Sequence, residues 1–319
     1  MFVDPERSYD LIGDVHGCAH TLTRLLEQLG YRHHGDVWRH PRRQVIFLGD
    51  IIDRGPRIRE ALHLVHAMVE AGQAHCIMGN HEFNALGWYT PAPPESGKTF
   101  VRDHTPRYAM LLQHTFEQFE QYSEDWSAFR EWFMTLPLYL ESERFRVVHA
   151  CWDNAVIGQL RQRLSQGRVD LDFLRDAAFN QGFAAKALDR LLRGTDMPLP
   201  EGLTLTSAEG FTRSFFRTKF WEENPQTYGD IVFQPDGLPE KAARMPLSES
   251  QKNKLLLYGP DDPLLFVGHY WRSGTPAPIR PNLACLDYSA VKYGKLVAYR
   301  LDEETRLDPA KFVWVDVER

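Results

Sequence analysis

The sequence contains no long apolar run. No stretch of its 319 residues approaches the roughly 20 consecutive apolar residues that a membrane-spanning helix needs. The segment from Met1 to Arg7 also lacks the basic region and following apolar stretch that mark a secretory signal. These two absences predict a cytoplasmic protein that has no membrane partner.

Cysteine is scarce and scattered. The four cysteines stand far apart, and no C-x-x-C pair occurs among Cys18, Cys76, Cys151 and Cys285. This usage is typical of reduced thiols in a reducing compartment and not of a disulfide framework. Three of the cysteines lie beside the motifs described below, where we expect small buried residues and not redox control.

Positive charge is not in excess either. The formal net charge of -6 argues against general binding of nucleic acid or anionic membranes, because either partner calls for a basic excess or patch. Hydrophobic residues make up 43% and charged residues 25% of the chain, as in ordinary folded proteins. No internal repeat and no low-complexity tract is present. Any affinity for phosphate must therefore come from a local group of residues and not from the overall charge.

The amino-terminal part alternates between predicted strands and helices. Short apolar strands are expected at residues 9–13, 45–48 and 76–78, and apolar residues at helical spacing predict helices that end at Gly30 and Gly72. This alternation is typical of a layered α/β fold. A polar cluster follows each strand, so the clusters should lie together at the carboxyl edge of a sheet, where α/β folds bind ligands.

The rest of the chain predicts a single domain over residues 1–319, with two elements added to its sheets. Residues 84–135 predict a cap element, with a Pro-rich turn from Pro91 to Pro94 and helix from about Tyr108 to Phe133. Residues 152–262 are interpreted as an insertion, because the residues on either side of it complete one site. Its first half is predicted to be helical and its second half to be ordered loop. Further strands, expected to form a second sheet, lie at residues 283–287, 296–301 and 312–315.

Three polar clusters follow the early strands. They are Gly13-Asp14-Val15-His16-Gly17, Gly49-Asp50-Ile51-Ile52-Asp53-Arg54-Gly55 and Gly79-Asn80-His81-Glu82. Carboxylate and amide oxygens and imidazole nitrogens are the ligands that hard or borderline divalent metals take. The glycines allow the sharp turns that bring such groups close together. Each cluster alone is weak evidence, because an Asp-x-His segment is often a surface turn and Asn-His-Glu can cap a helix.

Taken together and in this order, the clusters resemble the signature of calcineurin-like metallophosphoesterases, whose motifs read GDxHG, GDxxDRG and GNHE. Two later segments, Val148-His149-Ala150 and Gly268-His269, match the two further histidines of that family. The resemblance covers the sheet-forming parts of the chain but not the insertion. It implies an α/β fold of two packed mixed β-sheets flanked by helices, with a largely helical cap insertion.

The resemblance also implies a metal centre. Carried over to this sequence, it makes Asp14 and His16 ligands of one metal, Asp50 a bridge, and Asn80, His149 and His269 ligands of a second metal. The cofactors would be two divalent metal ions, manganese first, with iron, zinc or cobalt as alternatives because such oxygen and nitrogen ligands accept all of them. A bridging carboxylate holds the ions at the roughly 3.5 to 4 Å that two-metal hydrolysis needs.

The resemblance further implies direct attack on phosphorus by a hydroxide that bridges the metals, without a phosphoenzyme. Arg54 is expected to bind the phosphate together with Asn80, although a salt bridge within its own loop is the alternative. His81 resembles the proposed general acid of the family, with Asp53 as its orienting partner, and a purely structural histidine is the alternative. Glu82 is expected to cap or brace the following helix.

Two departures from the family pattern bear on the site. Asp287 is followed by Tyr288-Ser289 where the family usually has Asp-Thr-Gly, so a role for this carboxylate in orienting a ligand histidine stays open. His269 is followed by Tyr270, without the second histidine of the GHxH form. That absence favours the phosphoprotein phosphatase and dinucleoside tetraphosphatase branch over the exonuclease branch.

The substrate class is divided between nucleotides and proteins. The opening segment from Tyr9 to Cys18 resembles bacterial symmetrical diadenosine tetraphosphatases and their Bacillus-type relatives. The symmetrical enzymes commonly lack the aspartate that corresponds to Asp53, which phosphoprotein phosphatases keep. We therefore expect a small phosphorylated nucleotide such as diadenosine tetraphosphate, with a serine/threonine phosphoprotein as the alternative. A non-catalytic phosphate-binding scaffold, the alternative of another class, is disfavoured because the ligands, Arg54, Asp53 and His81 are all present.

The insertion and several aromatic residues offer further candidate contacts. Arg213 and Arg217 in the insertion could supply a second phosphate-binding arginine, or could lie in a helix with solvated tips. Aromatic residues next to the metal motifs could stack on a nucleobase, although packing is the commoner role for such side chains. These are Trp88, Tyr89, Tyr270 and Trp271.

Overall fold

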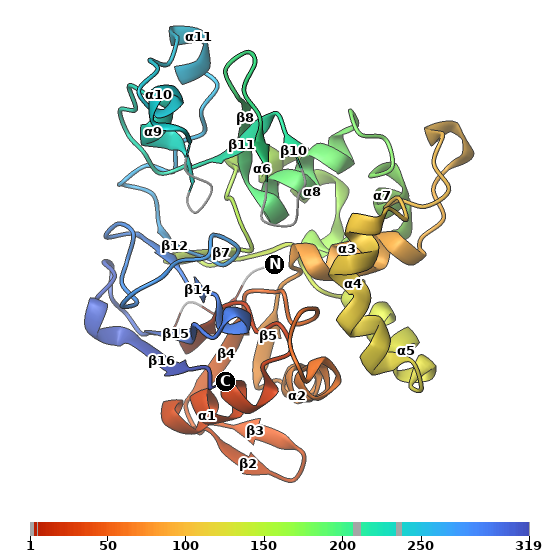
Figure 1. The fold of residues 1–319 in the computed structure, drawn as a ribbon. Helices are drawn as coiled ribbons and strands as arrows, with labels where there is room; N and C mark the ends of the chain where they lie inside the picture. Colours follow the sequence, from red (N-terminus) through yellow and green to blue (C-terminus); the bar gives the residue numbers. More distant parts are fainter. Residues whose placement is uncertain (1–2, 5, 207–211, 234–237, 319) are drawn as a thin grey trace.

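Two mixed β-sheets form the centre of the protein (Figure 1). The computed structural model describes residues 3–4, 6–206, 212–233 and 238–318. In this part of the chain the first sheet has the order β14-β15-β1-β4-β5, with β16 paired to β15. The bounds of its strands are β1 (Ser8–Ile12), β4 (Arg43–Phe47), β5 (Ala74–Cys76), β14 (Asp287–Tyr288), β15 (Lys295–Leu301) and β16 (Phe312–Asp316). Strands β1, β4 and β5 are parallel, whereas β15 is antiparallel to β1.

The second sheet has the order β13-β12-β7-β6. Its strands are β6 (Tyr139–Glu141), β7 (Phe145–Val148), β12 (Leu264–Val267) and β13 (Leu283–Cys285). Strands β7, β12 and β13 are parallel, and β6 is antiparallel to β7. The protein therefore has the α/β class with mixed sheets that the sequence predicts.

The sheets pack face to face through an apolar core. Tyr9 and Leu11 of β1 lie in one buried cluster with Val147 of β7 and Phe266 of β12. Successive residues of a strand point to opposite faces, so the alternate residue Ile12 belongs to the other buried cluster, which the helices cover. This two-layer packing fixes the carboxyl ends of both sets of parallel strands relative to each other.

Helices cover the outer faces of the sheets (Figure 1). Helix α1 (Ala19–Leu29) ends at Gly30, whose φ of 93° lies in the left-handed region that terminates helices, and α2 (Ile58–Glu70) ends two residues before Gly72. The hairpin of β2 (Arg32–His34) and β3 (Val37–Arg39) follows α1. Helices α3 (Asn80–Tyr89), α4 (Pro106–Phe119) and α5 (Ser123–Phe133) occupy the region of the expected cap.

Residues 152–262 contain both helices and strands. Helices α6 (Asn154–Arg163), α7 (Leu171–Asp176) and α8 (Phe183–Arg193) make up the first half, as the sequence predicts. The rest contains the antiparallel pair β8 (Thr195–Pro198) and β11 (Phe215–Thr218), the short pair β9 (Leu205–Thr206) and β10 (Thr212–Arg213), and helices α9 (Tyr228–Ile231), α10 (Glu240–Ala243) and α11 (Glu249–Lys252). Figure 1 shows this region on the opposite side of the sheets from α1 and the β2–β3 hairpin.

Three expectations about these elements are wrong. The helix considered as the alternative for the two insertion arginines is absent, since Arg213 lies on β10 and Arg217 on β11. The second half of the insertion is not only loop, because its short helices are capped locally, as by the capping box of Ser248 and Gln251. The carboxyl-terminal strands divide between the sheets, because β15 and β16 join the first sheet and only β13 joins the second.

No helix of the described segments is both long and apolar enough to cross a membrane.

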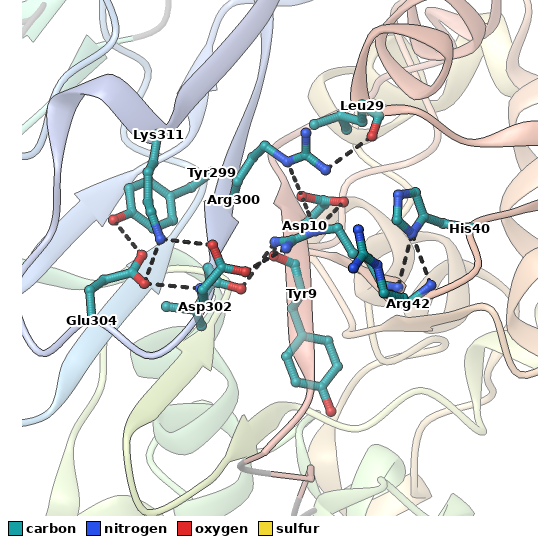
Figure 2. A network of polar contacts seen from close by, with 12 residues as sticks. Tyr9, Asp10, Leu29, His40, Arg42, Tyr299, Arg300, Asp302, Glu304 and Lys311 are labelled. Atoms are coloured by element: carbon teal, nitrogen blue, oxygen red, sulfur yellow. Dashed lines mark hydrogen bonds and ion pairs between the residues drawn. The ribbon is translucent and has the colours of Figure 1, made fainter.

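A buried ion network ties three strands together at the end of the first sheet opposite to the polar clusters (Figure 2). Asp10 on β1 is fully buried, and its carboxylate accepts hydrogen bonds from Arg43 Nε at 3.0 and 3.1 Å. Arg300 Nε on β15 donates to the same carboxylate at 3.1 Å, and the hydroxyl of Tyr31 donates at 3.0 Å. Because Arg43 and Arg300 come from the strands on either side of β1, one carboxylate links all three.

We predict that Asp10→Ala lowers the free energy of unfolding by about 3 kcal/mol, because it leaves the largely buried Arg43 side chain without its main counter-charge. Urea unfolding followed by circular dichroism measures the change. The matched control is Arg244→Ala, which removes an ion pair with Glu240 whose side chains are 79% and 78% exposed and should cost less than about 1 kcal/mol. Equal losses in the two variants would contradict the structural role given to Asp10.

Candidate metal centre

The loops after five parallel strands converge on one buried cluster of polar side chains. Strands β1, β4, β5, β7 and β12 all run toward the same edge, and the residues that follow them meet there. All of the residues that the family resemblance suggests as ligands are part of this cluster: Asp14, His16, Asp50, Asn80, His149 and His269. Residues distant in sequence are therefore brought together as the sequence suggests.

Asp50 lies at the centre of the cluster. Its Oδ2 is 3.7 Å from His16 Nε2 and 3.3 Å from His149 Nε2. It belongs to two groups whose ligand atoms lie within 4.8 Å of one another, one with His16 and His81 and the other with His149 and His269. A carboxylate shared by two such groups has the position that a bridge between two cations requires.

Backbone carbonyls orient two of the histidines. His16 Nδ1 donates to the carbonyl of Ile52 at 2.8 Å, and His149 Nδ1 donates to the carbonyl of Leu48 at 2.7 Å. When Nδ1 carries the proton, the lone pair of Nε2 faces Asp50 and is available to a metal. His269 differs from them, because it presents Nδ1 to the cluster, 2.8 Å from the Oδ1 of Asn80. This set of imidazole, amide and carboxylate donors fits divalent metals that prefer oxygen and nitrogen.

The buried carboxylates add a second reason to expect cations. Asp14 is buried beside Asp287, and burial together with the charge of Asp287 raises its pKa well above the ordinary value. Its two oxygens each lie 3.3 Å from the backbone nitrogen of His269. A side chain at Gly268 would come within 2.1 Å of Asp14 Oδ1, so glycine is required there. Negative groups packed this closely away from water are stabilised by a bound cation.

The protonation of the histidines follows from burial and from the nearest charges. Burial lowers the pKa of His16 and of His269 well below the ordinary value, and the charges of Arg54 and Arg217 respectively add to this effect. Burial also disfavours the charged form of His149, but the charge of Asp50 outweighs it and raises the pKa of His149 to about 10. In the absence of a cation the cluster thus holds neutral imidazoles at two positions and one imidazolium paired with Asp50, and a metal at His149 would displace its Nε2 proton.

His81 and Asp53 form a buried pair at the edge of the cluster. His81 Nδ1 lies 2.6 Å from Asp53 Oδ2, and its Nε2 lies 3.9 Å from Asp50 Oδ2. Burial raises the pKa of Asp53 to about 8 and lowers the pKa of His81 to about 3, so the pair retains a proton and carries no net charge near neutral pH. The hydroxyl of Thr115 on α4 donates to the other oxygen of Asp53. Thr115 gave no sequence signal, because it lies 62 residues from Asp53.

Glu82 connects two of the loops. Its buried carboxylate accepts hydrogen bonds from the backbone nitrogens of Asp50 and Ile51, both at 2.8 Å, and from that of Gly79 at 2.9 Å. Burial and the charge of Asp50 raise the pKa of Glu82 to about 7. The residue therefore both caps α3 and braces the loop after β4.

Several residues of the site have left-handed backbone conformations that non-glycine residues seldom adopt. These are His16, Asp50, Asp53, Arg54 and His269, with φ between 43° and 68°. Such conformations cost on the order of 1 kcal/mol or more each and are kept where the surrounding structure enforces them, often at functional sites. The concentration of strain supports a functional role for this cluster.

The three arginines proposed from the sequence to bind phosphate differ in what they contact. Arg54 is exposed, and no carboxylate of the described residues pairs with it, so the alternative of a salt bridge within its loop finds no support. Arg217 contacts His269 through Nη1, and burial lowers its pKa to about 10. Arg213 is half-buried on β10, where burial and the charge of Arg107 lower its pKa.

The four aromatic candidates differ in burial and in the side chains that they contact. Tyr270 is fully buried and packs edge-on against Trp221 and Phe233, so packing is its role. Trp88 stacks on His104 with ring centroids 3.7 Å apart. Tyr89 is 40% exposed and Trp271 37% exposed, but each already lies under a cation, Arg130 and Lys292 respectively.

Comparison with known proteins shows what this chain is similar to. Residues 9–270 match the family model described as calcineurin-like phosphoesterase. The chain is similar to the protein named bis(5'-nucleosyl)-tetraphosphatase PrpE [asymmetrical] of Oceanobacillus iheyensis, with 33% identity over 157 residues that cover 48% of this chain and 60% of that protein. The protein of the same name from Bacillus subtilis is 30% identical over 165 residues, which cover 49% of this chain and 63% of that protein. The matched segments thus span less than two thirds of either relative.

A solved structure shows the same fold. It is a protein serine/threonine phosphatase from Saccharomyces cerevisiae, which superposes with a TM-score of 0.52 over 99% of this chain and 81% of that chain. The two sequences are 13% identical, so the similarity concerns the fold alone.

We predict that Glu82→Gln weakens manganese binding by about 10- to 100-fold, because an amide cannot accept from three backbone nitrogens and the loop that carries Asp50 loses its brace. Equilibrium dialysis with Mn²⁺ measures the affinity. Glu117→Gln, at an exposed position on α4, removes the same charge and should bind manganese as the unaltered protein does. Indistinguishable affinities of the two variants would contradict the bracing role.

Proposed function

The chain belongs to the calcineurin-like phosphoesterase family, and from this premise we propose that it is a metal-dependent phosphohydrolase that cleaves phosphate esters or anhydrides. The observation that carries the proposal is the position of Asp50, which is shared by two groups of ligand atoms near Arg54, an exposed arginine that no carboxylate of the described residues pairs with. The proposed substrates are of nucleotide type, such as diadenosine tetraphosphate. The similarity to two proteins named tetraphosphatases supports this substrate class.

Two divalent ions would occupy the cluster. Asp14, His16 and Asp50 would hold one, and Asp50 with Asn80, His149 and His269 would hold the other. When bound, such ions lower the pKa of water and neutralise phosphate oxygens, which is the chemistry that direct hydrolysis needs. Manganese is the proposed metal, with iron, zinc or cobalt as alternatives.

Protein groups on either side of the cluster would bind the phosphate. Arg54 is exposed and has no carboxylate partner among the described residues, and the fork of its guanidinium can donate two parallel hydrogen bonds to one phosphate. Arg217 reaches the cluster from β11 through its contact with His269 and would take a second phosphate oxygen. Arg213 is proposed as a more distant contact, and the amide of Asn80 would help orient the substrate.

His81 would transfer the proton to the leaving oxygen. Its Nε2 faces the cluster, while Nδ1 is fixed by Asp53 at 2.6 Å. The negative charge of an incoming phosphate favours a protonated imidazole, and Asp53 compensates that charge on the far side of the ring. Thr115 holds Asp53 in position and is therefore a positioning residue.

The experiment that tests the proposal is phosphate release by the manganese-loaded protein. The panel contains p-nitrophenyl phosphate, bis-p-nitrophenyl phosphate, diadenosine tetraphosphate and a phosphothreonine peptide. We predict hydrolysis by the unaltered protein and a loss of at least about 100-fold in Asp50→Asn, because the shared ligand is lost. Absence of activity with metal confirmed bound would favour a phosphate-binding scaffold, and preference for the peptide would favour a serine/threonine protein phosphatase.

Product analysis decides the position of cleavage. Asymmetrical cleavage of diadenosine tetraphosphate yields ATP and AMP, whereas symmetrical cleavage yields two molecules of ADP. The relatives in the comparison are named asymmetrical, while the opening segment of the sequence resembles symmetrical enzymes. Separation of the nucleotides by chromatography distinguishes the two.

We predict that His81→Asn lowers kcat far more for phenyl phosphate than for p-nitrophenyl phosphate, because only the poorer leaving group depends on protonation. Thr115→Val should show the same dependence with a smaller loss of about 10-fold, because it leaves Asp53 without its hydroxyl partner. Steady-state kinetics on both esters measures the effect, with Thr23→Val on α1 as the control. A loss that does not depend on the leaving group would indicate a structural role for His81.

A further inference from the structure

A pair of arginines lies one helical turn beyond the metal centre. Helix α3 begins with Asn80 and His81, and Asn84 follows on the same face because residues three and four apart are neighbours on a helix. Asn84 is 1% exposed, and its Oδ1 accepts a hydrogen bond from Arg193 Nη2 at 3.1 Å. Arg193 is the last residue of α8, so the insertion delivers this cation next to the catalytic helix.

The charge of Arg193 is poorly compensated. Its nearest carboxylate among the described residues is that of Asp189, 4.0 Å from Nε and half-exposed. Its second hydrogen bond, 3.4 Å to the hydroxyl of Tyr108, is to a neutral group. The side chain of Arg193 is 24% exposed, and its two hydrogen bonds hold it against α3 and α4.

Arg102 lies next to Arg193 and has still fewer partners. Its guanidinium lies 4.5 Å from the centre of the Phe83 ring and 5.4 Å from that of Tyr108. Within the described part of the chain no side-chain hydrogen bond or ion pair satisfies it, and its Nε is buried without a partner. Stacking on aromatic faces fixes the plane of the group but leaves its N–H donors available. The charge of Arg193 adds to burial in lowering the pKa of Arg102, as expected of two close cations.

Two neighbouring cations with unused donors are costly unless an anion binds between them. Asn84 adds a further donor, because its Nδ2 is buried without a partner in the described structure. The fork of a guanidinium matches the oxygens of a phosphate group, and two forks can bind one group from two sides. The whole chain carries a net charge of -6, so the positive charge here comes from these two arginines and not from a general excess of basic residues.

We propose that Arg193 and Arg102 form a second phosphate subsite, which binds a phosphate group of a polyphosphate substrate beyond the one held at the metal centre. Tyr108 and Asn84 supply neutral hydrogen-bonding groups to the same subsite. The inference rests on the proposed phosphohydrolase function and specifies its substrate as one with a chain of phosphates. It also gives the insertion a role in selecting that substrate.

Binding of inorganic phosphates to the manganese-loaded full-length protein tests the subsite without requiring catalysis. Isothermal titration compares tripolyphosphate with orthophosphate. We expect the unaltered protein to prefer tripolyphosphate, and we expect Arg193→Gln to reduce that preference by about 10-fold, because a charged hydrogen bond is lost only for the longer anion. Arg175→Gln, which removes the same charge from an exposed position on α7, should keep the preference.

Two further variants guard against misfolding. Arg193→Lys keeps the charge but not the fork and should lose part of the preference, and Arg102→Met keeps the packing on Phe83 and should lose it as Arg193→Gln does. Folding of each variant is checked by circular dichroism. An unchanged preference in the folded glutamine and methionine variants would overturn the proposal.

Kinetics separates this inference from the proposed function. In Arg193→Gln the KM for diadenosine tetraphosphate should rise about 10-fold more than the KM for p-nitrophenyl phosphate. Equal changes in both would overturn the subsite while leaving the phosphohydrolase intact. Failure of the unaltered protein to hydrolyse any phosphate would instead refute the proposed function, and the titration would still decide whether the subsite exists.

Discussion

The buried carboxylate of Glu82 is the interaction on which the rest of the site depends. It accepts hydrogen bonds from backbone nitrogens at the end of the β5 loop and in the loop after β4, and so joins the two segments that carry Asn80 and Asp50. Asp50 in turn accepts a hydrogen bond from the backbone nitrogen of His81 at 2.9 Å. These two polar loops are thereby held as one unit, and the backbone nitrogens of Val15 and His16 join the first loop to them by donating to the carbonyl of Asp50. The carboxylate of Asp50 is aimed at His149 from the second sheet.

The closeness of these loops explains their backbone geometry. A side chain at Gly79 would come within 2.2 Å of Asp50 Oδ1, and one at Gly55 within 1.7 Å of the carbonyl oxygen of His16. Left-handed residues such as Asp50 and Asp53, in the loop that ends at Gly55, let nearby side chains point into one small volume. The strain is sustained because both ends of each loop continue into buried strands or helices that cannot shift independently. Rigid placement of ligands is what a dinuclear site requires.

Charge is distributed in two opposed layers around the cluster. Carboxylates and imidazoles form its centre, whereas arginines from the β4 loop, α8 and β11 lie around it. Cations bound at the centre and a phosphate bound between centre and arginines would balance both layers. The overall negative charge of the chain does not oppose this arrangement, because burial lets local charge decide binding over short distances.

Much of the fold and of the candidate site could be predicted from the sequence. The early strands, the helices that end near Gly30 and Gly72, and the gathering of Asp14, Asp50 and Asn80 at one sheet edge follow from short-range patterns. Such patterns are local, since apolar periodicity and glycine-flanked polar clusters occupy a few consecutive residues. The strand that the sequence predicts at residues 76–78 begins two residues earlier in the structure, as β5.

Only the tertiary structure decided which distant surfaces meet. The pairing of β15 with β1, the strand at Arg217, and the approach of Thr115, Arg102 and Arg193 to the site are not visible in local spacing. A threonine or arginine on a helix has the same local signature whether it faces solvent or a catalytic residue. Its role is set by long-range packing, because burial and the nearest charges come from segments far apart in the chain. The sequence by itself determined the chemistry of the centre, and the packing of α4, α8 and β11 against it determined the surroundings that would bind a substrate.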